Sequence, residues 1–429
     1  MVLFLGILFA LAVALALGLG HWYLWRRLVV DTRLGRPWRS VAGGLLWTAA
    51  LGLPVTVFVA RQTANPFVTP LVFLGFTWMG LLFYLVVLLI LRDAVFLGFR
   101  FRRRRAGRDD RPAAQADPNP AMQSGDEQQG DKIELDPAEA ESSEDVETAG
   151  DPSRRLFLTR ASAGVVVAGA AAVGLTGLRS AVWDIETPEV EVRLQRLPRA
   201  LSGYRIAVLS DLHLGPTLGA KFVARVIELT RRQKPDLVAI TGDLVDGSVR
   251  RLGSVVRPLA DLSARDGVFF VTGNHEYYSG VDAWVAFLKS IGIEVLMNSR
   301  VAIRGRQGFD LAGVPDFRAA VFRPGMGPKP REAVSGRDPD RELVMLAHQP
   351  VQIRANAAVQ PGLQISGHTH GGQIWPWGYM VRLTQPYLSG LHRYDAHCQV
   401  FVTRGAGYWG PPIRFLAPAE IPCLVLVSA

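Results

Sequence analysis

Seven side chains of the kinds that bind metal ions fall in five short clusters in the second half of the chain. They are Asp211, His213, Asp243, Asn274, His348, His368 and His370. Oxygen and imidazole donors without a thiolate suit Mn, Fe or Zn better than Ca or Mg. A carboxylate can bridge two cations, and cations about 3.5–4 Å apart hold both the attacking and the leaving oxygen of an in-line phosphoryl displacement. The residue types therefore predict a binuclear site for phosphoryl chemistry.

The elements that position these clusters are short apolar runs, each of which stops at the polar ligands. Such runs are typical of buried parallel strands, which collect chemistry at their carboxyl ends. Strands are expected near Ile206, Leu237, Val268, Phe309, Leu343, Leu363, Val400 and Cys423. Helix-length stretches at 220–232 and 282–291 lie between some of them. The alternation predicts an α/β domain over residues 188–429, with helices covering a sheet core.

The order of the clusters resembles the calcineurin-like metallophosphoesterase superfamily. The matching motifs are Asp211-x-His213, Gly242-Asp243-x-x-Asp246, Gly273-Asn274-His275-Glu276, His348 and Gly367-His368-x-His370. The extension to Gln373 and the tail motifs Gly405-x-Gly407, Arg414-Phe415 and Glu420-Ile421 are similar to bacterial membrane-associated or exported phosphodiesterases. The resemblance implies a four-layer α/β/β/α sandwich, and it covers the domain but not the first three apolar segments.

The resemblance also implies a role for each site residue. One metal would be held by Asp211, His213, Asp243 and His370, and the second by Asp243, Asn274, His348 and His368. Asp243 would bridge the two metals, and a metal-bridging hydroxide would be the nucleophile. His275 would protonate the leaving oxygen or stabilise transition-state charge, with orientation of a ligand as the alternative. Asp246 is expected to orient a ligand rather than to bind metal.

The sequence narrows the range of substrates expected for a member of this superfamily. Gly247 stands where protein serine/threonine phosphatases carry a phosphate-gripping arginine, so that branch is disfavoured. The expected activity is hydrolysis of phosphodiesters or phosphomonoesters, soluble or lipid-linked, at the outer side of the cytoplasmic membrane. Two alternatives stay open: a pyrophosphatase for nucleotide-linked lipid precursors, which would need a cytoplasmic domain, and a catalytically silent membrane-tethered scaffold.

The positive charge of the chain is placed as in a membrane protein. The formal net charge is +9 and the pI is near 9.9, but many arginines flank apolar segments. They are Arg26, Arg27, Arg33, Arg36 and Arg39 in one group, and Arg100 and Arg102 to Arg105 in another. This distribution follows the positive-inside rule, so no nucleic-acid partner is expected. The two cysteines, Cys398 and Cys423, are expected to be small core residues, with a disulfide between them as the alternative.

Three transmembrane helices are expected in a membrane region over residues 1–105. Residues 2–20, 41–60 and 70–91 are each nearly uncharged and long enough for a bilayer of roughly 30 Å. A cleaved signal peptide is the alternative for the first, but it lacks a basic start and is followed by interfacial aromatics. The basic loops predict that the amino terminus and the loop at 61–69 lie outside.

A disordered acidic linker is expected at 106–152, because its composition cannot bury enough apolar surface to offset chain entropy. At 153–180, Arg154 and Arg155 precede an apolar stretch from Ala161 to Leu178, which is predicted to be a fourth transmembrane helix. The spacing resembles a twin-arginine signal, which would make the twin-arginine export machinery a partner. An ordinary anchor is the alternative, and both place residues after 178 outside.

Large apolar residues lie just beyond the last candidate ligands. They are Trp375, Trp377, Tyr379 and Met380. They predict an apolar lip that faces a lipid substrate or the bilayer, with packing in the core as the alternative.

Overall fold

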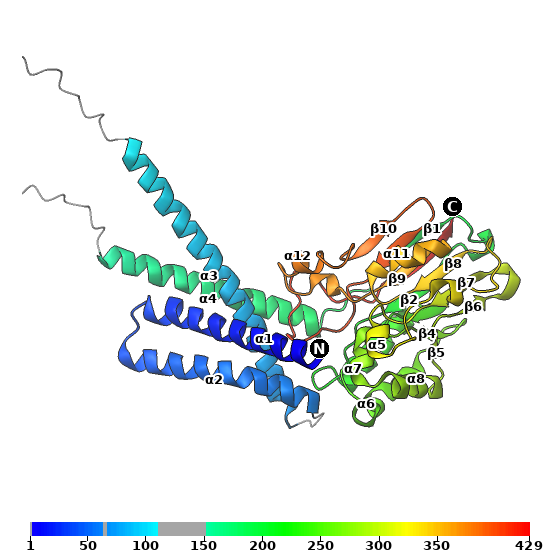
Figure 1. The fold of residues 1–429 in the computed structure, drawn as a ribbon, viewed down its shortest axis with the longest axis horizontal. Helices are drawn as coiled ribbons and strands as arrows, with labels where there is room; N and C mark the ends of the chain where they lie inside the picture. The colour runs from blue at the N-terminus through cyan, green and yellow to red at the C-terminus, as the bar shows by residue number, and fades with distance from the viewer. Residues whose placement is uncertain (1, 63–66, 110–151) are drawn as a thin grey trace, which may run out of the picture.

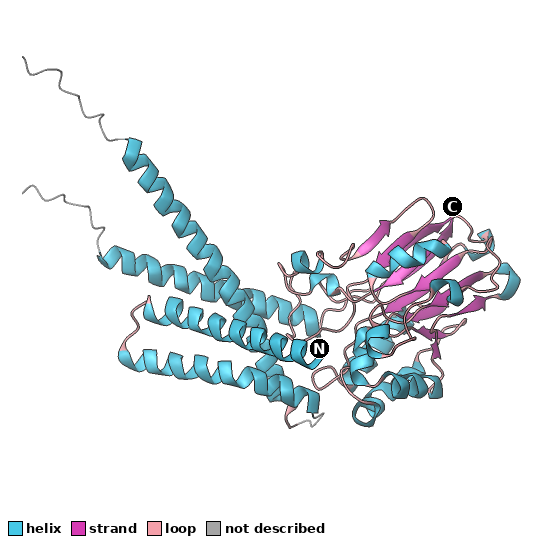
Figure 2. Cartoon of the chain, in the orientation of Figure 1, coloured by secondary structure: helices cyan, strands magenta, loops and turns pink. Residues whose placement is uncertain are grey.

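Long helices gather on one side of the molecule and a strand-rich domain on the other (Figure 1, Figure 2). The computed structural model describes residues 2–62, 67–109 and 152–429. The long helices are α1 (Val2–Leu24), α2 (Arg36–Gln62), α3 (Thr69–Asp109) and α4 (Pro152–Val182), and a π-helical segment, Trp25–Val30, continues α1. Helix α3 contacts each of the other three, so the four form one bundle.

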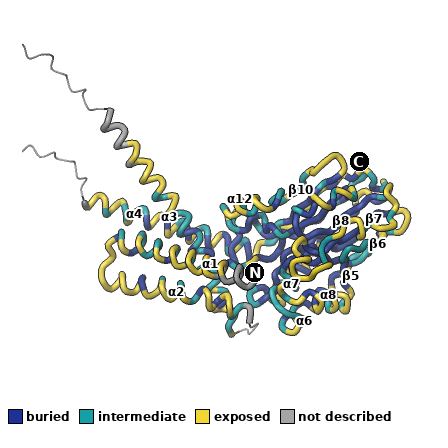
Figure 3. Tube along the Cα trace, in the orientation of Figure 1, coloured by how far each residue is buried: buried dark blue, intermediate teal, exposed yellow. Residues whose placement is uncertain are grey.

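Within the described residues, three helices are long and apolar enough to cross a bilayer, over Arg36–Ala60, Thr69–Phe99 and Ser153–Val182. Apolar side chains such as Leu45, Leu51 and Val165 are exposed on them, and Figure 3 shows exposed residues along the bundle. Helix α1 coincides with the first predicted span, but most of its early side chains lie outside the described part, so that span stays a prediction. The bundle indicates association with a membrane.

The predicted linker overlaps the end of α3. The helix continues to Asp109, past the expected boundary at 105, because arginine and alanine favour helix. Residues 110–151, which hold nearly all of the predicted linker, lie outside the described residues.

Two six-stranded sheets form the second part of the molecule. The first has the order β1-β12-β2-β3-β4-β5 and the second the order β10-β11-β9-β8-β7-β6. The strands are β1 (Glu189–Leu194), β2 (Tyr204–Leu209), β3 (Leu237–Ile240), β4 (Val268–Phe270), β5 (Glu294–Val295), β6 (Ser299–Ile303), β7 (Phe309–Gly313), β8 (Leu343–Leu346), β9 (Leu363–Ser366), β10 (Gly390–Arg393), β11 (Gln399–Val402) and β12 (Cys423–Ser428). Strands β2, β3 and β4 are parallel to one another, as are β7, β8 and β9.

The main core lies between the two sheets. Val208 and Ala239 of the first sheet share one buried cluster with Leu311, Leu346 and Ile365 of the second. The outer face of the first sheet packs against α5 (Ala220–Arg232), α6 (Val249–Val256) and α8 (Val281–Ser290). The remaining short helices are α7 (Asn274–Ser279), α9 (Ala319–Phe322), α10 (Pro330–Ala333), α11 (Ile353–Asn356) and α12 (Gly378–Val381). The predicted α/β class and its helix-covered sheet are confirmed.

The local predictions agree with this arrangement except at the sheet edges. All eight expected strands are present, and α5 has the expected bounds. Strands β1, β5, β6 and β10 were not expected. Cys398 and Cys423 are both buried and free, so the core interpretation of the cysteines holds and the disulfide alternative is wrong.

The domain is joined to the bundle by a loop at residues 411–415. Ile413 is fully buried in the cluster that contains Leu82 and Leu85 of α3 and Ala170 of α4. The backbone N–H of Arg414 donates to the carbonyl of Gly177 at 2.9 Å. A side chain at Gly177 would place its Cβ 2.5 Å from Ile413, so glycine permits this close approach. The position of the domain against the helices therefore rests on specific contacts.

Candidate metal centre

The two sheets bring all seven predicted ligands to one place. In the first sheet, Asp211 and His213 follow β2, Asp243 follows β3, and Asn274 begins α7 after β4. In the second sheet, His348 follows β8, and His368 and His370 follow β9. Carboxyl ends of neighbouring parallel strands meet at one edge of a sheet, and here the edges of two facing sheets adjoin. Most of the seven side chains are buried.

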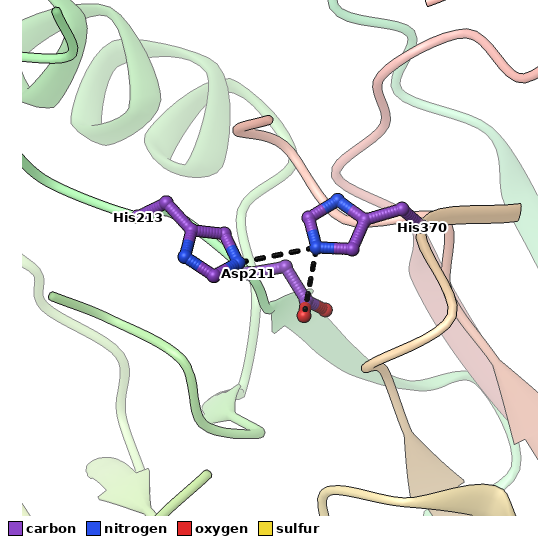
Figure 4. A group of neighbouring side chains, drawn as sticks. All are labelled: Asp211, His213 and His370. Atoms are coloured by element: carbon purple, nitrogen blue, oxygen red, sulfur yellow. Dashed lines mark hydrogen bonds and ion pairs between the residues drawn. The ribbon is translucent and has the colours of Figure 1, made fainter. Parts of the chain in front are cut away.

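One group of ligands consists of Asp211, His213 and His370. Nε2 of His370 lies 3.1 Å from Nε2 of His213 and 3.5 Å from Oδ1 of Asp211 (Figure 4). Nδ1 of His213 faces Oδ1 of Asp246 at 3.2 Å, so a proton on Nδ1 leaves Nε2 free to bind a cation. One carboxylate oxygen and two imidazole nitrogens therefore converge on one point.

A second group consists of Asp243, His348 and His368. Nε2 of His348 lies 3.1 Å from Oδ2 of Asp243 and 3.2 Å from Nδ1 of His368. Nδ1 of His348 is 2.7 Å from the carbonyl of Thr241, which again leaves Nε2 for a cation. Oδ2 of Asp243 is also 3.9 Å from Nε2 of His213 in the first group. Asp243 thus lies between the two groups.

The donor set fits divalent cations. The side-chain oxygen of Asn274 is buried without a hydrogen-bond partner, which is costly for a polar atom unless a ligand completes it. Burial lowers the pKa of His368 to about 3 and also lowers the pKa of His370, so both imidazoles are neutral at pH 7. Neutral imidazole is the form that binds metal. Divalent metal binding therefore agrees with the geometry of the site and with the neutral imidazoles of His368 and His370.

The backbone at the ligands is held in an unusual conformation. Asp211, His213, Asp243, His368 and His370 all have positive φ, between 43° and 70°. Such conformations persist only where surrounding contacts fix them, and they cluster at functional sites. The backbone N–H of Asp211 donates to the carbonyl of Gly242, and that of His368 donates to the Asp211 carboxylate at 3.0 Å. The surrounding contacts therefore hold the ligand residues in strained backbone conformations that position their side chains.

His275 and Asp246 lie beside the ligands. Nδ1 of His275 is 2.5 Å from Oδ1 of Asp246, and Nε2 is 4.0 Å from Oδ2 of Asp243. Burial lowers the pKa of His275, but Asp243 and Asp246 outweigh it and raise this pKa to about 9. His213, Asp243 and His275 also satisfy the geometry of a metal-binding group. Asp246 contacts both histidines by one oxygen, which is the geometry of an orienting residue.

Two buried residues have structural roles that their types alone did not indicate. Glu276 accepts hydrogen bonds from the backbone N–H groups of Asp243, Leu244 and Gly273 at 3.0, 2.8 and 2.6 Å, and so ties two ligand loops together. A Cβ at Gly273 would collide with Asp243, so that loop needs glycine. Glu276 belongs to the motif Gly273-Asn274-His275-Glu276, but the role of its carboxylate depends on a turn that the sequence does not specify.

Arg414 is the second such residue. Its guanidinium is buried and donates to the carbonyls of Gly407, Arg404, Ala417 and His370. It therefore supports the backbone of one candidate ligand from the loop that enters the helix bundle. The only sequence signal was its place in the tail motif.

Comparison with known proteins agrees with this arrangement. The family model described as calcineurin-like phosphoesterase matches residues 204–372. A transmembrane protein with metallophosphoesterase domain from Danio rerio is 38% identical over 267 residues, which cover 60% of this chain and 61% of that protein. An uncharacterized metallophosphoesterase from Helicobacter pylori is 39% identical over 240 residues, with 56% and 63% covered. One from Aquifex aeolicus is 32% identical over 240 residues, with 56% and 90% covered.

The fold and the ligand groups define a protein with a candidate metal centre, and the comparisons supply its family. The chain belongs to the calcineurin-like metallophosphoesterases, which are metal-dependent phosphoesterases. It spans about three fifths of the length of the first curated relatives that it matches.

Proposed function

We propose that this protein is a binuclear metal-dependent phosphoesterase that acts on phosphodiesters or phosphomonoesters. The observation that carries the proposal is the pair of ligand groups on either side of Asp243, with the unpartnered oxygen of Asn274 beside them. The first metal is assigned to Asp211, His213, Asp243 and His370, and the second to Asp243, Asn274, His348 and His368. Mn, Fe and Zn suit these donors.

Two bound cations would supply Lewis acidity and a water nucleophile near neutral pH. The other tasks fall to the protein. Nδ1 of His275 is engaged by Asp246, so Nε2 is the atom available to give a proton to the leaving oxygen. Only 14% of the His275 side chain is exposed, so most of the imidazole is shielded from bulk water.

We place the catalytic domain at the outer side of the cytoplasmic membrane. The supporting observation is that the domain adjoins the carboxyl end of α4, whereas Arg154 and Arg155 stand at the opposite end of that helix (Figure 1). Positive residues favour the cytoplasmic side. The bacterial exported branch and a twin-arginine route for residues 153–180 belong to the same proposal. Short helices α10 and α11 on the outer face of the second sheet favour the four-layer sandwich.

The activity is tested on the full chain in detergent, by metal analysis and a panel of phosphate esters. Asp243→Asn is compared with Asp261→Asn, because Asp261 is exposed and outside the site. We expect about two divalent ions per chain, and a loss of roughly a hundredfold or more in kcat/KM for Asp243→Asn only, equivalent to at least about 2.7 kcal/mol. Undiminished activity of Asp243→Asn would refute the shared-ligand assignment.

The orientation is tested separately. Two reporters are fused after Ala429 in turn. The reporter that works only outside the cytoplasm should be active, and the reporter that works only inside it should be inactive. A cytoplasmic result would contradict the proposed orientation and favour the pyrophosphatase alternative.

A further inference from the structure

An exposed group of large apolar side chains follows the last candidate ligand, His370, in the chain. We define the aromatic rim as Trp375, Trp377, Tyr379, Met380 and Leu383, which lie on and around α12 and are each between 45% and 75% exposed. A soluble surface rarely gathers so many large apolar side chains in one short segment. Tryptophan and tyrosine are the residues that favour the membrane–water interface, because their rings are apolar and carry one polar group.

The rim is fixed to the helices that form the membrane bundle. Ile374 directly precedes it and pairs with Phe415 as an isolated parallel bridge. The ring of Phe415 packs against Tyr84 of α3, with centroids 5.9 Å apart, and Ile374 belongs to the same apolar cluster. Figure 1 shows α12 next to the bundle, close to the carboxyl-terminal end of α4. The segment that carries the rim is therefore packed against the apolar helices that are candidate membrane spans.

The same segment is tied to the site. His370 stands only five residues before Trp375 in the sequence. Oε1 of Gln373 accepts from the backbone N–H of Trp409 at 3.0 Å, and Nε2 donates to the carbonyl of Trp409 at 3.0 Å. The ring of Trp409, which is itself more than half exposed, lies 5.9 Å from the ring of His275. Gln373 and Trp409 thus connect the segment that carries the rim to the residue proposed to protonate the leaving group.

We infer that the aromatic rim is seated in the bilayer interface and that the metal centre takes phosphate esters carried by membrane lipids. The partner is the bilayer, because the rim is continuous with the contacts between the domain and the membrane helices. In this position the phosphate of a lipid headgroup reaches the metal centre while its acyl chains stay in the membrane. The inference rests on the proposed phosphoesterase activity and names the substrate class of that same site.

The test uses the full chain in nanodiscs of phosphatidylcholine and phosphatidylglycerol. The lipid substrates are phosphatidic acid, a monoester, and phosphatidylglycerol, a diester. Their hydrolysis is compared with that of bis(p-nitrophenyl) phosphate, a soluble diester. The rim variant is Trp377→Ser with Tyr379→Ser and Leu383→Ser. Tyr394→Ser is the matched control, because Tyr394 is also exposed but lies beyond β10 and outside the rim.

We expect the rim variant to lose about tenfold or more in kcat/KM on the lipid ester and to stay within about twofold on the soluble diester, because the lost contacts act on the lipid alone. Tyr394→Ser should change neither rate. Equal losses on both substrates, or no loss on either, would overturn the inference. A wild-type chain that cleaves the soluble diester but neither lipid would overturn it while leaving the proposed function intact. A metal-loaded chain that cleaves no ester would refute the proposed function itself.

A second readout does not depend on activity. The tryptophan emission of Trp377 is obtained as the difference between the wild type and Trp377→Phe. In nanodiscs whose acyl chains are brominated near the headgroup, this emission should be among the most strongly quenched of the tryptophans in the chain. An unquenched Trp377 contribution would place the rim in water and contradict the inference.

Discussion

Substitution of Arg414 by methionine removes the hydrogen bonds that hold the tail loop, while it keeps an unbranched stem as far as the position of Nε. In the native protein the guanidinium donates to the carbonyls of Gly407 at 2.6 and 2.9 Å, Arg404 at 2.7 Å, Ala417 at 3.0 Å and His370 at 3.2 Å. Arg414 itself is 1% exposed, so water cannot easily replace it. The carbonyl of His370 also accepts from the backbone N–H of Gln373 at 3.0 Å, so the variant leaves the carbonyls of Gly407, Arg404 and Ala417 without this donor.

The cost follows from these three groups. A buried polar group left without a partner costs roughly 1–3 kcal/mol, so the set amounts to about 3–9 kcal/mol. We take the lower end of this range, because the methionine variant no longer buries a positive charge that lacks a direct carboxylate partner, and this offsets part of the cost. Burial lowers the pKa of Arg414 to about 10, which is another sign of that desolvation. We expect a loss of about 3 kcal/mol, which corresponds to about 6–12 °C in Tm for a domain of this size.

The assay is thermal unfolding of the full chain in detergent, followed by tryptophan fluorescence with and without added Mn²⁺. Arg354→Met is the control, because Arg354 is exposed. The Tm of Arg414→Lys should lie between those of the wild type and Arg414→Met, because an ammonium has three donors for four carbonyls. This variant also keeps the test measurable if Arg414→Met does not fold. Metal affinity should fall in both Arg414 variants, because the backbone of His370 loses support. The reasoning is refuted if Arg414→Met lowers Tm no more than Arg354→Met does.

Three further predictions concern the ligands and the cysteines. Asp246→Asn should lower turnover or metal affinity about 10–100-fold, because it perturbs the orientation of His213 and His275, and wild-type values in a metal titration and a rate assay would contradict this. Removal of metal by a chelator should abolish hydrolysis and lower Tm, and Mn²⁺ should restore both; an unchanged Tm would argue against a buried metal centre. Burial raises the pKa of Cys398 to about 12 and that of Cys423 to about 11, so both stay protonated until the pH approaches those values. Neither thiol should react with N-ethylmaleimide at pH 8 unless the chain is unfolded, and mass spectrometry that finds a label on the native protein would show that prediction to be wrong.

The sequence by itself indicated the central strands and the candidate ligands that follow them. Strands β2 and β3 lie inside the first sheet and are covered on both faces, so their residues are almost all apolar up to the point where Asp211 and Asp243 follow. Burial on both faces forces such a run, and a run of this kind can be recognised locally. Helix α5 was placed correctly for a similar reason, because one side packs on the sheet and the other faces water.

The strands that the sequence did not indicate are the four edges of the two sheets. They are β1, β5, β6 and β10. An edge strand has a neighbour on one side only and is partly exposed, so polar residues interrupt its pattern, as in Glu189–Leu194. Their identity depends on which strand is already in place beside them, and that information is not local.

Only the tertiary structure decided how the parts of the site support one another. Glu276 binds three N–H groups from two loops, and Arg414 joins a loop buried among the membrane helices to the backbone of His370. The aromatic rim was visible in the sequence, but its exposure and its contact with the bundle through Phe415 were not. Each of these facts depends on a close approach between residues far apart in the chain. Local composition records which residues are buried, whereas it does not record which distant segment buries them.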